Sequence, residues 1–236
     1  MTSDHTSNQP FGGFLVSSRA LGEYRAMFAL TDADLRRRLL DCPGGAAGFT
    51  AAVRGLGGDV TACDLAYANG GTAEVAATAA GEVVRGNDYV RAHPEQFRFT
   101  YFAGPGEHLT VRQRAAELFA AHSRTEPDRY VAGALPGLPF GDNAFDLVLS
   151  SHLLFSYAAD LDYAFHLAAV RELLRVGTEA RIFPLVPIGA DERYRDLDRL
   201  LADLREHGIE GRIVDVDYEF QAGAHQMLLC RKPARP

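Results

Sequence analysis

Two acidic residues enclose a glycine-rich segment in the first third of the chain. Asp41 follows the apolar pair Leu39 and Leu40, and Asp64 lies 23 positions later, at the end of a second apolar segment. Glycine lets the backbone bend tightly and approach a ligand closely, and the N-terminus of the helix after such a turn favours polar ligands. In doubly wound folds a carboxylate about 20 residues beyond the turn meets the ribose hydroxyls of a nucleotide. The segment therefore predicts a site for a ligand that contains an adenosyl group.

The glycines of this turn match neither of two common phosphate-binding patterns. In the register that ends on Gly45 and Gly48, the pattern G-x-G-x-x-G requires a third glycine where Pro43 stands, which disfavours a nicotinamide dinucleotide. A P-loop requires Lys after its last glycine, and Phe49 stands there instead. Asp41, before the turn, can accept hydrogen bonds from an ammonium group or order the loop. The pattern favours a nucleoside that carries an amino acid.

An acid followed by a glycine-rich turn resembles the first motif of the class I S-adenosylmethionine (SAM)-dependent methyltransferases. The common form of that motif is Asp-x-Gly-x-Gly-x-Gly, and Pro43, Gly45 and Ala47 occupy its three glycine positions here. The resemblance implies SAM as the cofactor. Together with a helix before the first strand, it implies cofactor contacts at Tyr24, Asp41, Cys42, Pro43, Gly44, Gly45, Gly48, Asp64 and Leu65. A packed core tyrosine is the alternative for Tyr24.

A second motif covers residues 129–155. An apolar loop, a turn at residues 141–143 and the continuously apolar segment 145–149 predict a buried strand of a parallel sheet. The motif resembles the fourth-strand region of small-molecule methyltransferases. Where that family has an acid that contacts adenine, Ala134 stands here, so backbone must replace the side chain. The cofactor contacts that the resemblance implies here are Ala134, Leu135, Ser150 and Ser151.

The fourth strand is expected to end near Ser150, and ligands of open parallel sheets bind beyond the carboxyl ends of the strands. His152 falls at this place, and histidine can take a proton near neutral pH. We predict His152 as the general base, with a positioning hydrogen bond or a cap on the following turn as alternatives. Tyr157 is a second catalytic candidate.

An insert separates the third expected helix, 73–85, from the third expected strand, 129–132. About forty residues lie between them, and long connections in compact domains are usually functional. We predict that residues 86–127, which include a helix over 110–122, cover the acceptor, although the aromatic residues there could simply anchor the insert. The candidate acceptor contacts are Tyr89, Tyr101, Phe102, His108 and, after the fourth strand, Phe155.

The order of elements predicts an α/β fold with a doubly wound, Rossmann-like sheet of seven strands whose last strand is antiparallel. Residues 1–18 are expected to be disordered or loosely packed, and residues 19–236 to form one methyltransferase-like domain. The further expected helices cover 19–30, 49–56, 162–175 and 191–207, and the later strands cover 179–188, 212–217 and 225–231.

Composition limits the partners and the compartment. The 236 residues carry a formal net charge of −7, which argues against a nucleic-acid substrate. No apolar run approaches the ~20 residues of a membrane span and no export signal is recognisable, so we expect a cytoplasmic protein without membrane contact. Three cysteines without metal or disulfide spacing are expected to be reduced core residues, and no metal ligand set is recognisable. The sequence leaves a monomer and a homodimer equally open.

The motifs together predict transfer of a methyl group from SAM to an oxygen, nitrogen or carbon nucleophile of a small molecule. Two alternatives from other classes stay open. One is a SAM-binding catalyst of cyclisation or rearrangement, which the irregular glycine turn and Ala134 favour mildly, and the other is a binding module without catalysis. A nicotinamide-dependent reductase is opposed by Pro43 and by the second motif.

Overall fold

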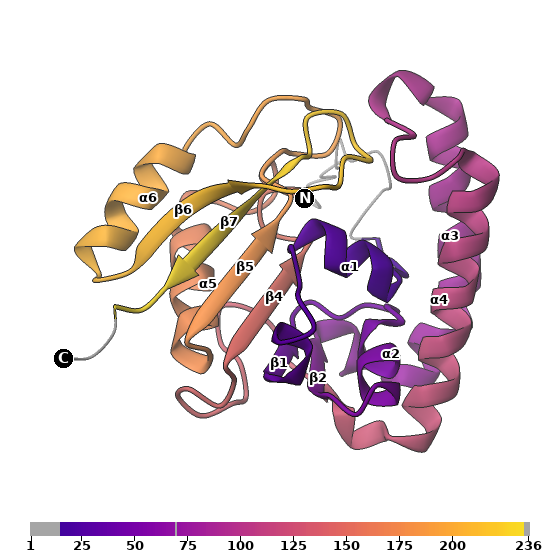
Figure 1. Cartoon of the computed structure of the whole chain (residues 1–236), viewed down its shortest axis with the longest axis horizontal. Coiled ribbons are helices and arrows are strands. Elements are labelled where there is room, and N and C mark those ends of the chain that lie inside the picture. Colours follow the sequence, from indigo (N-terminus) through magenta and orange to yellow (C-terminus); the bar gives the residue numbers. More distant parts are fainter. Residues whose placement is uncertain (1–14, 69, 234–236) are drawn as a thin grey trace, which may run out of the picture.

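A seven-stranded sheet forms the centre of the protein. The computed structural model describes residues 15–68 and 70–233. The strands are β1 (Arg38–Asp41), β2 (Asp59–Asp64), β3 (Tyr130–Ala132), β4 (Leu147–Ser151), β5 (Glu179–Phe183), β6 (Glu210–Asp215) and β7 (Gln226–Arg231). Their order is β3-β2-β1-β4-β5-β7-β6, and only β7 runs antiparallel to its neighbours (Figure 1). The predicted fold class, with its antiparallel last strand, is confirmed.

Helices cover both faces of this sheet. They are α1 (Leu21–Met27), α2 (Phe49–Gly55), α3 (Gly71–Ala92), α4 (Pro105–Thr125), α5 (Tyr163–Val176) and α6 (Leu197–Glu206). Leu39 shares a core cluster with Phe49 of α2. Leu40, the next residue, shares one with Val170 of α5, because successive side chains of a strand point to opposite faces. Within the described residues, none of the helices has the length and apolar content needed to cross a membrane.

Two predicted elements are shorter than expected. The fifth strand, predicted over 179–188, ends at Phe183, because Pro184 has no N–H with which to continue the ladder. The helix predicted over 191–207 begins only at Leu197. The amide of Tyr194 donates instead to the carbonyl of Leu185 at 2.8 Å, and this holds the preceding residues in a loop.

The predicted insert is mostly helical. The helix expected over 73–85 continues to Ala92, and α4 runs back alongside it at the β2–β3 side of the sheet (Figure 1). The connection 93–104 reaches the link between β6 and β7. There the amide of Arg98 donates to the carbonyl of Phe220 at 2.7 Å, and the amide of Ala222 donates to the carbonyl of Gln96 at 2.9 Å. The connection and the link therefore form one wall, built from two distant parts of the chain.

Arg181 of β5 anchors α1 to the sheet. Its buried guanidinium donates to the carbonyl of Phe28 at 2.8 Å, just beyond α1, and pairs with Asp34 at 3.1 Å. It also pairs with Glu179 of its own strand at 2.7 Å. A buried cation with these partners is satisfied, whereas loss of one carboxylate would leave a buried charge uncompensated. The network thus holds α1 in place beside the edge of the sheet that carries the site.

Close packing of α2 against α4 yields a first prediction. Gly48→Ala would place a methyl carbon 3.0 Å from the carbonyl oxygen and 3.1 Å from the Cα atom of Ala115. Because those atoms belong to the backbone of α4, we expect the free energy of unfolding to fall by about 1–3 kcal/mol, as measured by urea denaturation.

Gly55→Ala, at the other end of α2, is the matched control. No atom of another described element lies within 4 Å of its added carbon, so alanine should raise the stability by about 0.5–1 kcal/mol. A Gly48→Ala protein as stable as the wild type would contradict the packing role.

Candidate functional site

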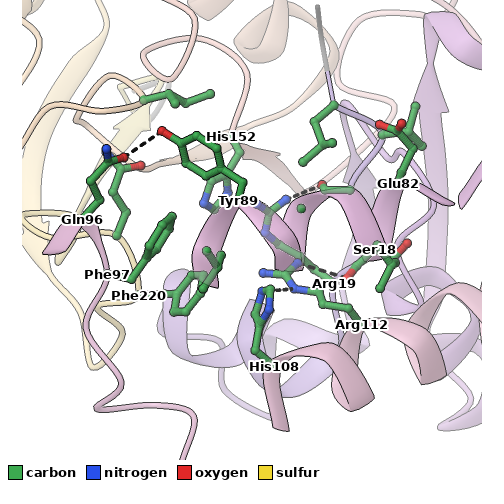
Figure 2. A pocket seen from close by; sticks show the side chains of 18 of the residues that line it. Ser18, Arg19, Glu82, Tyr89, Gln96, Phe97, His108, Arg112, His152 and Phe220 are labelled. Atoms are coloured by element: carbon green, nitrogen blue, oxygen red, sulfur yellow. Dashed lines mark hydrogen bonds between the residues drawn. The ribbon is translucent and has the colours of Figure 1, made fainter. Parts of the chain in front are cut away.

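Two cavities lie at the edge of the sheet where the parallel strands end. The larger cavity, of about 610 Å³, is lined from the ends of β1, β2 and β4 and from the loop after β3. The smaller cavity, of about 120 Å³, lies among the segment before α1, the helices α3 and α4, and the wall formed by the 93–104 connection and the β6–β7 link (Figure 2). The residues common to both linings are Leu15, Val16, Ser17, His152 and Tyr157.

The turn after β1 borders the larger cavity through Gly45. Its φ angle is +52°, and an added Cβ would lie 3.0 Å from the carbonyl oxygen of Ser17, so glycine is needed for both conformation and space. The amide of Gly45 donates to Oδ2 of Asp64 at 2.7 Å. The hydroxyl of Tyr67 donates to the carbonyl of Gly45, also at 2.7 Å. The turn is thereby held against the end of β2.

Asp64 presents its carboxylate to the same cavity. Oδ1 accepts a hydrogen bond from the amide of Ala66 at 2.9 Å, in addition to the bond from Gly45 to Oδ2. Burial raises the pKa of this carboxyl above its usual value, and the two amide donors oppose that shift. Each carboxylate oxygen has a second lone pair, so Asp64 can accept further hydrogen bonds from a ligand.

Asp41 and Tyr24 lie behind this cavity, contrary to their predicted contact with the cofactor. Both are buried, and neither is among the residues that line the larger or the smaller cavity. The hydroxyl of Tyr24 lies 3.0 Å from each oxygen of Asp41, and its ring stacks on Phe49 with centroids 4.2 Å apart. Burial raises the pKa of Asp41 well above its usual value. The pair supports the turn from the core. The sequence pattern could not show this, because residue spacing does not reveal whether a side chain at the end of a strand faces the core or the cavity.

Three more predicted cofactor contacts are also absent from the lining. An added Cβ at Gly44 would meet Ala62 and the hydroxyl of Tyr67 at 2.8 Å, so this glycine allows the turn to pack on β2. Gly48 packs on α4, as described above. Ser150 is buried, and its side chain points to the opposite side of β4 from Ser151, which lines the cavity.

The remaining predicted cofactor residues gather in one place. Because β1, β2 and β4 are parallel, their carboxyl ends meet at one edge of the sheet. Their contact with a cofactor stays a prediction. The predicted cofactor residues among those that line the larger cavity are Cys42, Pro43, Gly45, Asp64, Leu65, Ala134, Leu135 and Ser151.

His152 stands at the boundary of the two cavities, directly after β4. It adopts a left-handed conformation with φ +52°, and its amide donates to the carbonyl of Phe183 at 2.7 Å. Nδ1 lies 2.8 Å from the hydroxyl of Ser151. Burial, with the nearby charges of Arg19 and Arg112, holds the pKa of this imidazole well below its ordinary value. At neutral pH the ring is therefore uncharged, and the same surroundings make its lone pair less basic than that of a free imidazole.

Tyr157, the other catalytic candidate, also borders both cavities. Its hydroxyl accepts a hydrogen bond from the amide of Leu15 at 2.9 Å, which ties the segment before α1 to the loop after β4. Burial raises the pKa of this phenol, so it stays protonated at neutral pH.

Of the five predicted acceptor contacts, only Tyr89 and His108 line the smaller cavity. Tyr101 is 36% exposed on the outside and packs on Tyr218. Phe102 is buried behind the wall, where its ring meets those of His108 and Phe220. Phe155 lies in the core on the α5 face, stacked on His166. These three predictions are corrected, because aromatic residues in a local sequence serve packing as readily as binding.

Sequence reasoning missed the two arginines of the smaller cavity. Arg19, before α1, is 8% exposed and Arg112, on α4, is 6% exposed. Arg112 lies four positions after His108, which is one turn of a helix, so its place on the same face could have been inferred. No local sequence pattern indicates that Arg19 is buried, because the residues that bury it come from distant parts of the chain.

Comparison with known proteins gives one curated relative of similar length. An uncharacterized protein of Methanocaldococcus jannaschii is 29% identical over 223 residues, which cover 92% of this chain and 96% of the relative. No protein-family model matches the chain.

Several solved structures are similar in outline. A SAM-dependent methyltransferase of Thermotoga maritima has 12% identity and a TM-score of 0.44, with 89% of this chain and 87% of that chain covered. PigF with S-adenosylhomocysteine (SAH) has 14% identity and a TM-score of 0.46, with 90% and 60% covered. A protein of Pyrococcus horikoshii named as a candidate RNA methyltransferase has 8% identity and a TM-score of 0.43, with 89% and 81% covered. Likenesses this weak carry no information about ligand or reaction.

The buried Tyr24–Asp41 pair predicts a pH-dependent loss of stability. Tyr24→Phe removes a donor that favours the ionised carboxylate, so the pKa of Asp41 should rise further. In both proteins the folded state holds a proton that the unfolded state releases, so stability falls with rising pH until the folded pKa of Asp41 is passed. Because that pKa is higher in the variant, the variant goes on losing stability at pH values where the wild type no longer does. We expect a loss of about 1–3 kcal/mol near pH 5 that grows towards pH 8, as measured by urea denaturation.

Tyr67→Phe is the control for this measurement. It removes a similar hydroxyl, but that hydroxyl donates to a carbonyl that does not titrate. Its destabilisation should hardly vary between pH 5 and pH 8. Parallel pH profiles for the two variants would show that Asp41 does not respond to Tyr24.

Proposed function

We propose that this protein transfers the methyl group of SAM to a small-molecule acceptor. The observation that carries the proposal is the carboxylate of Asp64, which faces the larger cavity beside the left-handed Gly45 turn. A carboxylate at the end of the second strand suits the two hydroxyls of a ribose. The cavity of about 610 Å³ has room for a nucleoside with an amino-acid chain.

The lining of the larger cavity fits the chemical groups of SAM. Leu65 is 63% exposed although it is apolar, and with Leu135 it offers contacts to an adenine ring. Backbone groups at Ala134 can replace the acidic side chain that the resemblance led us to expect. Gly45 leaves space for the chain that joins the ribose to the sulfur. When bound, SAM supplies a methyl group on a positively charged sulfur, and that sulfur leaves as a neutral thioether.

The smaller cavity is the proposed place of the acceptor. It shares a wall with the larger cavity, so a nucleophile held there can approach a methyl group presented through that wall. Its volume of about 120 Å³ favours a small molecule. A protein with a net charge of −7 does not attract a polyanion electrostatically. We therefore propose that nucleic acid is not the acceptor.

His152 is the proposed general base. In the tautomer whose Nδ1–H donates to the hydroxyl of Ser151, Nε2 carries the lone pair that can take a proton from the acceptor. The ring is uncharged at neutral pH for the reasons given above. Alignment of two bound reactants can lower a barrier by several kcal/mol.

Binding of SAH, the demethylated product, tests the cofactor assignment. Wild-type protein should bind SAM and SAH in calorimetric titrations and should not bind NADH. Asp64→Asn should weaken SAH binding by about 10- to 100-fold, because a hydrogen bond to a charged group contributes about 1.5–3 kcal/mol.

Glu74→Gln is the matched control, since Glu74 lines the same cavity but is exposed at its rim. It should change the affinity by less than about threefold. Thermal melts verify that each variant is folded. Equal SAH affinity of the Asp64→Asn variant and the wild type would remove the cofactor assignment.

Methyl transfer itself is tested at His152. Asn tolerates left-handed backbone, so His152→Asn should keep the local conformation. With the acceptor found by screening, we expect turnover to fall about 10²- to 10⁴-fold while SAH affinity stays within about threefold of wild type. A variant with full turnover would exclude His152 as the base. A methylated product separates methyl transfer from cyclisation and from mere binding.

A further inference from the structure

The smaller cavity contains a positive charge that has no carboxylate partner in the described part of the chain. Arg112 is paired, because Nη2 lies 2.8 Å from Oε1 of Glu23 and Nη1 donates to the carbonyl of Ser18 at 3.0 Å. Arg19 differs. Its Nη1 donates to the hydroxyl of Ser17, and no carboxylate in residues 15–68 and 70–233 lies within 4.0 Å of it. Two buried guanidinium groups thus face one buried carboxylate.

Two polar atoms at this place lack a hydrogen-bond partner among the described residues. They are Nε of Arg19 and the hydroxyl of Ser18, both fully buried and both in residues that line the smaller cavity. Buried polar groups are nearly always satisfied, so adjacent exceptions in one cavity wall require an explanation. A ligand with two acceptor atoms would satisfy both.

The arrangement of side chains around the cavity also favours a ligand with acceptor atoms. Figure 2 shows the side chains of Arg19 and Arg112 at the cavity, with His108 next to Arg112 and with Phe97 and Phe220 on another side. Nε of Arg112 lies 3.3 Å from Nε2 of His108, and the ring of His108 stacks on Phe220 at 4.6 Å. The cavity therefore has a cationic end and an aromatic wall.

The charges act on their neighbours as expected for a net positive potential, which Glu23 offsets only in part. Burial and then Arg112 lower the pKa of Arg19 to about 10, so it stays protonated at neutral pH. Burial, followed by the charges of Arg112 and Arg19, lowers the pKa of His108 to about 2. His108 is thus neutral, and the positive potential comes from the two arginines.

We propose that the smaller cavity binds the carboxylate of a small organic acid through Arg19 and Ser18, and that this acid is the methyl acceptor. The planar fork of a guanidinium matches the two oxygens of a carboxylate, and a buried charge-assisted pair of this kind is strong. The aromatic wall takes the body of the acid. The second half of this inference rests on the proposed function.

A carboxylate could also come from the amino-acid end of the cofactor. The structure favours the acceptor, because Arg19 and Ser18 line the smaller cavity and not the larger one. The two sources are separated by measuring SAH and the acid independently.

The test is calorimetric titration of SAH-saturated protein with benzoate, 4-hydroxybenzoate and acetate, each compared with its amide. Wild-type protein should bind at least one acid and should bind the matching amide at least about tenfold more weakly. Arg19→Gln should weaken binding of that acid at least about tenfold and leave SAH affinity unchanged. Arg25→Gln, a charge removal on the exposed pair with Asp32, should leave both affinities unchanged.

A second measurement guards against a folding defect. Arg19→Gln removes a buried charge without a partner, so its melting temperature should equal or exceed that of wild type, and the acid should raise the melting temperature of wild type only. If Arg19→Gln does not fold, Arg19→Lys keeps the charge without the fork and should bind the acid with reduced affinity.

Three outcomes would overturn the proposal. One is that no acid binds, or that the amides bind equally well. Another is that Arg19→Gln leaves acid binding intact. The third is that Arg19→Gln weakens SAH binding as strongly as it weakens acid binding, which would assign Arg19 to the cofactor and leave the proposed function standing. Absence of SAH binding by wild type would instead refute the proposed function, and the acid titration without SAH would then report on the anion site alone.

Discussion

The hydrogen bonds that the carboxylate of Asp64 accepts from the amides of Gly45 and Ala66 join the ends of β1 and β2. They fix the left-handed turn at Gly45 and leave the same carboxylate facing the larger cavity. Parallel pairing of β1 with β2 and β4 adds His152 to this edge. A single half-buried carboxylate therefore organises the turn, and the proposed cofactor site depends on it.

A second carboxylate organises the smaller cavity. Glu23 of α1 pairs with Arg112 of α4 at 2.8 Å and accepts hydrogen bonds from the hydroxyl of Tyr218 at 3.1 Å and from the amide of Ala20 at 3.0 Å. It thereby joins the N-terminal segment, the α3–α4 pair and the β6–β7 link. Because one carboxylate with these partners cannot also neutralise Arg19, the cavity keeps a positive charge, and the proposed acid would supply the missing anion.

Much of the fold could be predicted from local patterns, and the site only in part. Hydrophobic runs and glycine stops act over a few residues, and they sufficed to predict several elements. These are the strands that end at Asp41 and Asp64, the helix that begins at Phe49 and the antiparallel last strand. The predicted site residues that line cavities lie mainly at strand ends, where topology alone brings them together. Tyr101, Phe102 and Phe155 were placed wrongly, because an aromatic side chain has no local signal that separates packing from binding.

The sequence by itself determined the order of strands and helices along the chain, the glycine turn at Gly45 and the position of Asp64 at the end of a strand. Residue spacing and conformational preference suffice for these features. Only the tertiary structure decided that Asp41 turns into the core and that Arg19 is buried beside Arg112. Burial depends on which distant segments pack over a residue. The smaller cavity collects its walls from segments more than 200 residues apart, from Ser18 to Phe220, and no short pattern records such a meeting.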